Sequence, residues 1–178
     1  MKTIITTILA ILLVATIIIL PAMAGETPEA GDLAPEFKLQ DQNGEWHDLK
    51  QYRGTWLAIY FYPKDQTPGC TTEACNFRDN IHAFKAIGAE VVGISVDDVE
   101  SHKEFSDKYN LPFVILADEG GATADAYGVL RDYKLMKIAG RQSFLVNPDG
   151  MIVKHYEEVD PDTHTQEVLS DLNALMTP

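Results

Sequence analysis

Cysteine is scarce in this sequence, because the 178 residues contain only two, Cys70 and Cys75. So low a count excludes the disulfide-rich scaffold of small secreted domains. It also argues against structural zinc, which needs about four ligands, since no second cysteine pair and no histidine cluster at ligand spacing is present. With 46% hydrophobic residues, a chain of this length can bury a core without covalent support. The scarcity therefore favours chemistry over stapling for the two thiols.

Basic residues are also few, with 14 Lys and Arg against 27 Asp and Glu and a formal net charge of -13. This balance argues against nucleic acids and anionic membrane surfaces as partners and is typical of a soluble exported protein. Internal repeats, low-complexity runs and breaks in composition are absent after residue 32. We therefore expect one domain over residues 33–178, preceded by a polar lead-in over residues 25–32.

The N-terminus has a composition of its own. Lys2 is followed by an uncharged apolar run that ends at Pro21, and Ala-Met-Ala ends at Ala24. This pattern predicts a signal peptide over residues 1–24 with cleavage after Ala24. The run also approaches the roughly 20 residues of a spanning helix, so an uncleaved membrane anchor is the alternative. Either interpretation places the folded part outside the cytoplasm, periplasmic or secreted, with membrane contact only through an uncleaved anchor.

Apolar runs alternate with amphipathic stretches along the rest of the chain. The pattern predicts strands over residues 57–62, 90–96, 113–116, 142–146 and 151–156. It predicts helices over residues 71–87, 99–109 and 122–127, and a last helix from residue 160 or 163. Such an order indicates an α/β fold, a mixed sheet with helices on both faces. Functional sites in that architecture lie at the carboxyl ends of strands, where the loop before Cys70 falls.

The residues before Cys70 favour a reactive thiol. Thr67, Pro68 and Gly69 form a turn that leads directly into a helix, so Cys70 should lie in its first turn. Unpaired N–H groups and the helix dipole favour the thiolate there, and the thiolate is the nucleophilic form. The Thr67 hydroxyl, three residues back, can reach the thiolate or an oxygen bound beside it.

Cys75 lies five residues further along the same predicted helix. Standard helix dimensions place the two Cα atoms about 8.7 Å apart, on directions about 140° different. A disulfide tolerates at most about 7 Å, so the two thiols bond only if the helix start unwinds.

Three other interpretations of the pair stay open on spacing alone. Zinc and a copper site that adds a distant histidine such as His155 are two of them, although copper-delivery proteins usually have CxxxC spacing. Two inert buried thiols are the third. The CxxC motif of a thioredoxin-like reductase is absent.

The stretch PKDQTPGC, residues 63–70, fits the PxxxTxxC motif of peroxiredoxins. The adjoining GCTTEACNFRD resembles the bacterioferritin-comigratory protein, or peroxiredoxin Q, branch, whose second cysteine also follows five residues later. APEFKLQDQNGEWHDL, VVGISVDD and GRQSFLVNPDG resemble further segments of that branch, so the similarity covers about residues 30–178. It implies a thioredoxin-like fold with an N-terminal extension. The Gln-Ser pair after Arg141, where related chains often carry Thr, is a mild departure.

The resemblance implies a thiol peroxidase with an antioxidant role. Cys70 matches the peroxidatic cysteine, whose thiolate attacks a hydroperoxide and becomes a sulfenic acid. Thr67 matches the threonine that binds thiolate and peroxide, and Pro63 the proline that shields the site from water. Arg141 matches the arginine that supports the thiolate and the leaving oxygen. Taken without the motif, Arg141 is a surface arginine at a strand end.

Cys75 matches the resolving cysteine, which forms an intramolecular disulfide with Cys70. The family implies recycling by thioredoxin or a thioredoxin-like reductant, no metal or other cofactor, and a monomer. A non-enzymatic thioredoxin-like protein that binds copper or senses redox state is the alternative function. Glu73 is interpreted only as a helix-dipole partner and Arg78 only as a surface ion-pair partner, so neither is assigned to the site.

Overall fold

The computed structural model describes residues 26–176. The predicted signal peptide and its alternative, a membrane anchor, lie outside these residues. Among residues 26–176, no helix combines the length and the apolarity that a membrane crossing requires.

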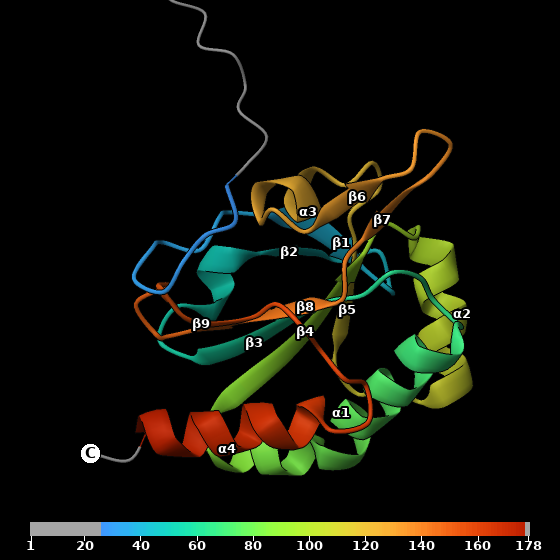
Figure 1. Ribbon diagram of the computed structural model, residues 1–178. Coiled ribbons are helices and arrows are strands. Elements are labelled where there is room, and N and C mark those ends of the chain that lie inside the picture. The colour runs from blue at the N-terminus through green and yellow to red at the C-terminus, as the bar shows by residue number, and fades with distance from the viewer. Residues whose placement is uncertain (1–25, 177–178) are drawn as a thin grey trace, which may run out of the picture.

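A seven-stranded mixed sheet forms the centre of the domain (Figure 1). Its strands, in spatial order, are β2 (Trp46–Asp48), β1 (Lys38–Asp41), β5 (Val114–Ala117), β4 (Ala89–Ser95), β3 (Trp56–Phe61), β8 (Gln142–Val146) and β9 (Ile152–Tyr156). The pairs β3–β4 and β4–β5 are parallel, and all other pairs in this sheet are antiparallel. Strand β3 lies inside the sheet between β4 and β8, and all but its first residue are buried, which explains its uninterrupted apolar sequence.

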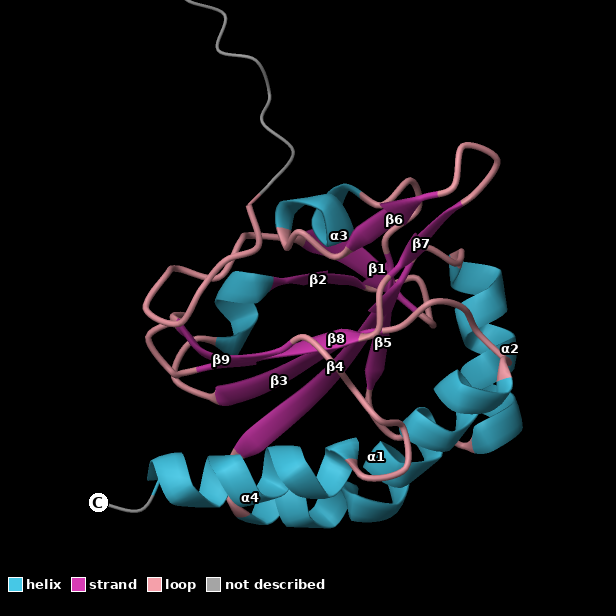
Figure 2. Cartoon of the chain, in the orientation of Figure 1, coloured by secondary structure: helices cyan, strands magenta, loops and turns pink. Residues whose placement is uncertain are grey.

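Helices cover both faces of the sheet, as predicted (Figure 2). On one face α1 (Pro68–Ala86) and α4 (His164–Met176) lie side by side, and α2 (Val99–Tyr109) packs beside them. The other face carries the short α3 (Ala122–Ala126) and the 3₁₀ helix η1 (Leu49–Tyr52). The mixed α/β architecture expected from the sequence is confirmed.

The core has two parts because alternate residues of β3 point to opposite faces. Ala58 and Tyr60 face α1 and α4, where they join a buried cluster that contains Phe77 and Leu172. Leu57, Ile59 and Phe61 face the other way, towards Tyr127 and Phe144. Cys70 belongs to the first cluster, so the core packing of α1 holds it in place.

Two pairs of short strands were not predicted from the sequence. These are β1–β2 and a separate hairpin of β6 (Leu130–Asp132) and β7 (Lys137–Ala139). Strands of three or four residues are too short to show a clear alternation. The loop joining β6 to β7 projects from the domain in Figure 1, and Leu135 at its tip is 99% exposed.

The described part of the polar lead-in lies along β9. The Gly31 N–H donates to the Ile152 carbonyl at 2.8 Å, and the Ile152 N–H donates to the Asp32 carbonyl at 2.9 Å. These bonds attach residues 26–32 to the sheet edge. The division between lead-in and domain at residue 32 stays a prediction.

Candidate active site

The loop after β3 delivers Cys70 to the start of α1. Thr67 is the N-cap with extended backbone angles, and Pro68 takes the first helical position, where a missing N–H costs nothing. The Thr71 N–H donates to the Thr67 carbonyl at 2.9 Å, which closes the first turn of the helix. Cys70 therefore lies within that turn, as predicted, near the free N–H groups of the helix.

Arg141 reaches Cys70 from the neighbouring strand. Strand β8 runs antiparallel to β3 with Gln142 opposite Phe61, so the residue before β8 lies at the carboxyl end of β3. From there Arg141 Nη2 donates to Cys70 Sγ at 3.1 Å. A guanidinium N–H directed at sulfur stabilises the thiolate more than the thiol. Cys70 is only 1% exposed, so large oxidants have no direct access to the sulfur.

Gly69 makes room for this contact. A Cβ atom at Gly69 would lie 3.2 Å from Arg141 Nη2 and 3.6 Å from Pro161 Cγ. The absence of a side chain there lets the guanidinium approach the first turn of α1 closely. The Thr-Pro-Gly sequence thus positions the helix start and also its charged neighbour.

Glu73 holds the other side of the guanidinium. It is fully buried, and its carboxylate accepts a hydrogen bond from Arg141 Nη1 in an ion pair. Burial raises the pKa of Glu73 to about 7, although Arg141 opposes this shift. Burial lowers the pKa of Arg141, but Glu73 and Cys70 outweigh that effect and raise it overall, so the guanidinium stays charged.

The interpretation of Glu73 as a mere helix-dipole partner was wrong. Glu73 lies three residues after Cys70, and residues three or four apart share a helix face. That face is buried, since it also carries Ala74 and Phe77. The helical periodicity could therefore have shown that Glu73 faces the core beside the reactive thiol.

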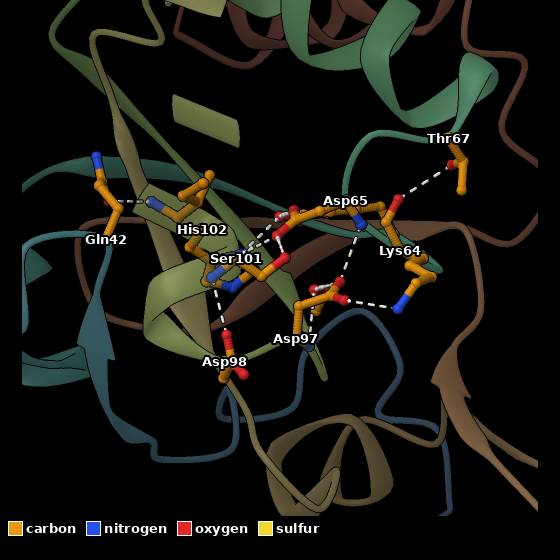
Figure 3. Close-up of polar contacts among 11 residues, drawn as sticks. Gln42, Lys64, Asp65, Thr67, Asp97, Asp98, Ser101 and His102 are labelled. Atoms are coloured by element: carbon orange, nitrogen blue, oxygen red, sulfur yellow. Dashed lines mark hydrogen bonds and ion pairs between the residues drawn. The ribbon is translucent and has the colours of Figure 1, made fainter. Parts of the chain in front are cut away.

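Thr67 and Pro63 lie in the loop that leads to Cys70, but the Thr67 hydroxyl has another partner in this structure. It donates to the Lys64 carbonyl at 3.0 Å (Figure 3) instead of to Cys70. Pro63 is half-buried at the beginning of the same loop. The structure thus brings Pro63 and Thr67 to the helix start without showing a contact of the Thr67 hydroxyl with sulfur.

Cys75 is a free thiol of intermediate exposure, and Cys70 is a free, buried one. Helix α1 is continuous through both positions. The thiols are thus separated by intact helix, as the five-residue spacing predicts.

Neither cysteine belongs to a cluster of metal-ligating side chains within residues 26–176. The one group of three His, Cys, Asp or Glu donors found there consists of Asp41, Glu45 and His47, beside the β1–β2 turn. The Asp41 carboxylate accepts hydrogen bonds from the backbone N–H groups of Asn43 and Glu45, so it stabilises the turn between β1 and β2. His155, the histidine considered for copper, stacks on a core phenylalanine with ring centroids 4.3 Å apart.

The sequence is similar to one protein family over most of its length. Residues 30–155 match the AhpC/TSA family. The chain is 44% identical over 146 residues to a chloroplastic peroxiredoxin Q of Oryza sativa subsp. japonica, covering 82% of this chain and 67% of the relative. It is 40% identical over 153 residues to peroxiredoxin Bcp of Bacillus subtilis (strain 168), covering 82% and 96%.

Solved structures with the same fold include members of the same group of proteins. A cysteine-to-serine mutant of Xylella fastidiosa PrxQ has a TM-score of 0.80 and 31% identity, covering 86% of this chain and 100% of its own. The bacterioferritin comigratory protein of Xanthomonas campestris has a TM-score of 0.76 and 33% identity, covering 84% and 100%. That second structure was determined to explain the reduction of alkyl peroxides by the Xanthomonas protein.

Proposed function

Since the chain belongs to the AhpC/TSA family, in its peroxiredoxin Q and Bcp group, and is a thiol-dependent peroxidase, we propose which residues carry out each step of the peroxidase reaction. Family membership favours this enzyme over the non-enzymatic copper-binding or redox-sensing alternative. The observation that carries the assignment of residues is the contact of Arg141 Nη2 with Cys70 Sγ at the start of α1.

Cys70 is the peroxidatic residue in this proposal. Its thiolate attacks one oxygen of a hydroperoxide, an S–O bond forms and the O–O bond breaks. The departing oxygen takes up a proton and leaves as water or an alcohol, while Cys70 becomes a sulfenic acid. Arg141 stabilises the thiolate beforehand and the negative charge that develops on the leaving oxygen.

Three further residues support this first step. Glu73 holds the Arg141 guanidinium in the orientation that the step requires, through the buried ion pair. Pro63 shields the sulfur from water, and Thr67 binds the peroxide oxygen after its hydroxyl turns away from the Lys64 carbonyl. Glu73 is a positioning residue, because it acts through Arg141.

Cys75 completes the cycle as the resolving residue. Its thiolate attacks the sulfenic sulfur of Cys70, the S–S bond forms and the sulfenic oxygen leaves as water. The intact helix separates the two thiols, so the first turns of α1 must unwind for this step. A thioredoxin-type dithiol then supplies the two electrons that restore both thiols, as is typical of the family.

The substrates in our proposal are hydrogen peroxide and small organic hydroperoxides. Support comes from the almost complete burial of Cys70 and from the alkyl peroxide reduction named for the Xanthomonas campestris relative. We also propose a monomer.

The N-terminal sequence supports an extracytoplasmic location, periplasmic or secreted. If the signal peptide is cleaved after Ala24, mass spectrometry of protein recovered from an exporting host will show Gly25 as the first residue. An intact N-terminus in the membrane fraction would instead identify the segment as an anchor.

Cysteine variants test the assignment of the catalytic steps. We expect Cys70→Ser to abolish peroxide consumption, because it removes the nucleophile. Cys75→Ser should consume one equivalent of peroxide and then stop, because the sulfenic acid has no internal partner. Mass spectrometry of the peroxide-treated wild type should show a Cys70–Cys75 disulfide. Peroxide consumption by the Cys70 variant at the wild-type rate would refute the proposal.

A further inference from the structure

A buried polar network holds the loop between β3 and α1 (Figure 3). At its centre is Asp65, which is 5% exposed. Its carboxylate accepts hydrogen bonds from the Tyr62 hydroxyl at 2.8 Å and the Ser101 hydroxyl at 2.7 Å. His102 Nδ1 lies 2.8 Å from the same carboxylate, and because a carboxylate only accepts, Nδ1 is the nitrogen that carries hydrogen. The loop is thereby joined to the first turns of α2.

A second carboxylate, Asp97, fixes the backbone of the same loop. It accepts the Asp65 N–H at 2.9 Å and the Ser95 hydroxyl at 2.7 Å. Lys64 Nζ, on the loop, approaches it at 3.2 Å from the solvent side. The loop is thus anchored to the end of β4 as well as to α2.

Burying such a network costs desolvation free energy that an apolar core does not. His102 is completely buried, and its Nε2 has no partner among residues 26–176. Apolar side chains of similar volume often stabilise a protein as well as or better than a buried ion pair does. Polar groups make the packing geometrically specific, because each hydrogen bond is directional and fixes the position of its partner. The position fixed here is that of the loop.

The held loop determines where α1 begins. Between Asp65 and the N-cap Thr67, Gln66 has a φ of 59°, in the left-handed region that costs energy for a residue with a side chain. The hydrogen bonds of the Asp65 carboxylate with α2 and of the Asp65 N–H with Asp97 hold the chain in this bend. Three residues after Thr67 comes Cys70, whose contact with Arg141 requires the helix start in this place.

We propose that Asp65 and His102 are positioning residues that set the balance between the intact and the unwound start of α1. With the network in place, the loop holds the first turn closed, so Cys70 stays beside Arg141 to meet peroxide. Weakening the network favours the unwound start, in which Cys70 reaches Cys75. This inference rests on the proposed roles of the two cysteines.

The proposal predicts opposite effects on two rates. Loss of the Asp65 charge in Asp65→Asn should slow the reaction of Cys70 with peroxide, since fewer molecules present the closed site. The same change should speed disulfide formation, since the helix start opens more easily. A closed site also favours attack by a second peroxide on the sulfenic acid, so the variant should form less sulfinic acid per turnover. A general loss of stability would not separate the two rates in this way.

Asp41→Asn is the matched control. Asp41 is also a buried carboxylate beside a histidine, with His47 Nε2 at 3.3 Å, but it lies at the β1–β2 turn. Both substitutions remove one buried carboxylate charge from a histidine pair. Only the substitution at Asp65 touches the loop that carries Thr67.

The experiment uses the full chain. Stopped-flow measurements in the Cys75→Ser background give the rate constant for the first step with hydrogen peroxide. Titration with hydrogen peroxide and mass spectrometry, with Cys75 present, give the fraction of sulfinic acid per turnover. For Asp65→Asn we expect the first rate constant and the sulfinic fraction each to fall about tenfold, on the scale of one or two lost hydrogen bonds. Asp41→Asn should change neither by more than about twofold.

A milder variant covers the case in which Asp65→Asn does not fold. Ser101→Ala removes one hydrogen bond to Asp65 and should shift both quantities in the same directions by about threefold. The inference would be overturned if the Asp65 or Ser101 variant that folds kept the wild-type rate constant and sulfinic fraction, or if Asp41→Asn shifted both by as much. Either result would leave the proposed function standing. A wild type that forms no Cys70–Cys75 disulfide would overturn the proposed function itself.

Discussion

Arg141 and Glu73 form a charged pair beside Cys70 in which the carboxylate is completely buried. Removing Arg141 leaves the buried Glu73 carboxyl group without its partner, so Glu73 must take up a proton or stay charged in the core, and either costs stability. Replacing both members by apolar side chains of similar volume avoids that penalty. The pair therefore offers a way to separate the contribution of Arg141 to stability from its contribution to catalysis.

We expect Arg141→Met to lower the free energy of unfolding by about 1–3 kcal/mol, because Glu73 loses its hydrogen-bond partner and, with a pKa already near 7, takes up a proton in the core. The rate constant with peroxide should fall by about 10²–10³, because the donor to sulfur is gone. The double variant Arg141→Met/Glu73→Met should recover most of the stability and none of the rate, because no polar group is left buried without a partner. Urea unfolding and stopped-flow kinetics measure the two quantities. Recovery of the rate in the double variant would contradict the proposed role of Arg141.

At the residue scale, the sequence revealed the reactive groups but not the groups that hold them. Cys70 could be singled out from the turn and helix start around it, and the roles of Cys75 and Arg141 from the family resemblance. Glu73 could have been found from the buried helix face that it shares with Cys70. The Asp65–His102 pair could not, because acidic residues are usually exposed and no periodicity marks this loop residue as buried. Their burial depends on contacts between segments far apart in the chain, such as Asp65 and His102, which are 37 positions apart.

Helix α4 depends on a buried histidine at its first residue. His164 Nε2 lies 2.8 Å from the Ser143 hydroxyl, and its ring lies edge-on to Phe77 of α1. Burial, with the positive charges of Arg141 and Lys154, lowers the pKa of His164 to about 4. The folded protein therefore takes up this proton less readily than the unfolded chain does.

This shift makes the attachment of α4 sensitive to acid. The unfolded chain binds the proton below its pKa of 6.5, but folded His164 binds it only near 4, so stability is lost as the pH falls between these values. The loss from this group alone is on the order of 3 kcal/mol. We expect hydrogen exchange in α4 to accelerate between pH 6.5 and 4.5 relative to the intrinsic rate. His164→Gln should remove that dependence, and an unchanged pH profile in the variant would contradict the assignment.

At the element scale, the helices and strands whose ends carry clear capping or turn residues were the ones that could be predicted. The predicted helix over residues 99–109 agrees with α2 at both ends, because Asp98 caps it and Asn110 ends it in a left-handed conformation. The hairpin of β8 and β9 was likewise expected from its Asn-Pro-Asp-Gly turn. The start of α1 at Pro68 differs by three residues from the prediction, since proline suits the first helical turn.

For the whole molecule, the proposed catalytic cycle replaces core packing at the start of α1 with the Cys70–Cys75 disulfide. The start of α1 contributes buried side chains to the core, among them Ala74 and Phe77. Forming the Cys70–Cys75 disulfide requires part of this helix to leave its place and breaks the contact of Arg141 with Cys70. The bond itself closes a loop of only a few residues, which stabilises a protein by about 2 kcal/mol in the chain-entropy model.

The lost packing should outweigh the gain from the disulfide. Complete exposure of a core side chain costs about 1.5–3 kcal/mol, so partial exposure of two or three of them, together with the lost hydrogen bond, costs about 4 kcal/mol. A net loss of about 2 kcal/mol corresponds to a melting temperature lower by about 4–8 °C for a domain of this size. We expect this decrease after one equivalent of peroxide, measured by calorimetry against the reduced protein. Cys75→Ser, which cannot form the bond, should show no comparable decrease. An oxidised wild type that melts at or above the reduced form would mean that the disulfide forms without unwinding α1.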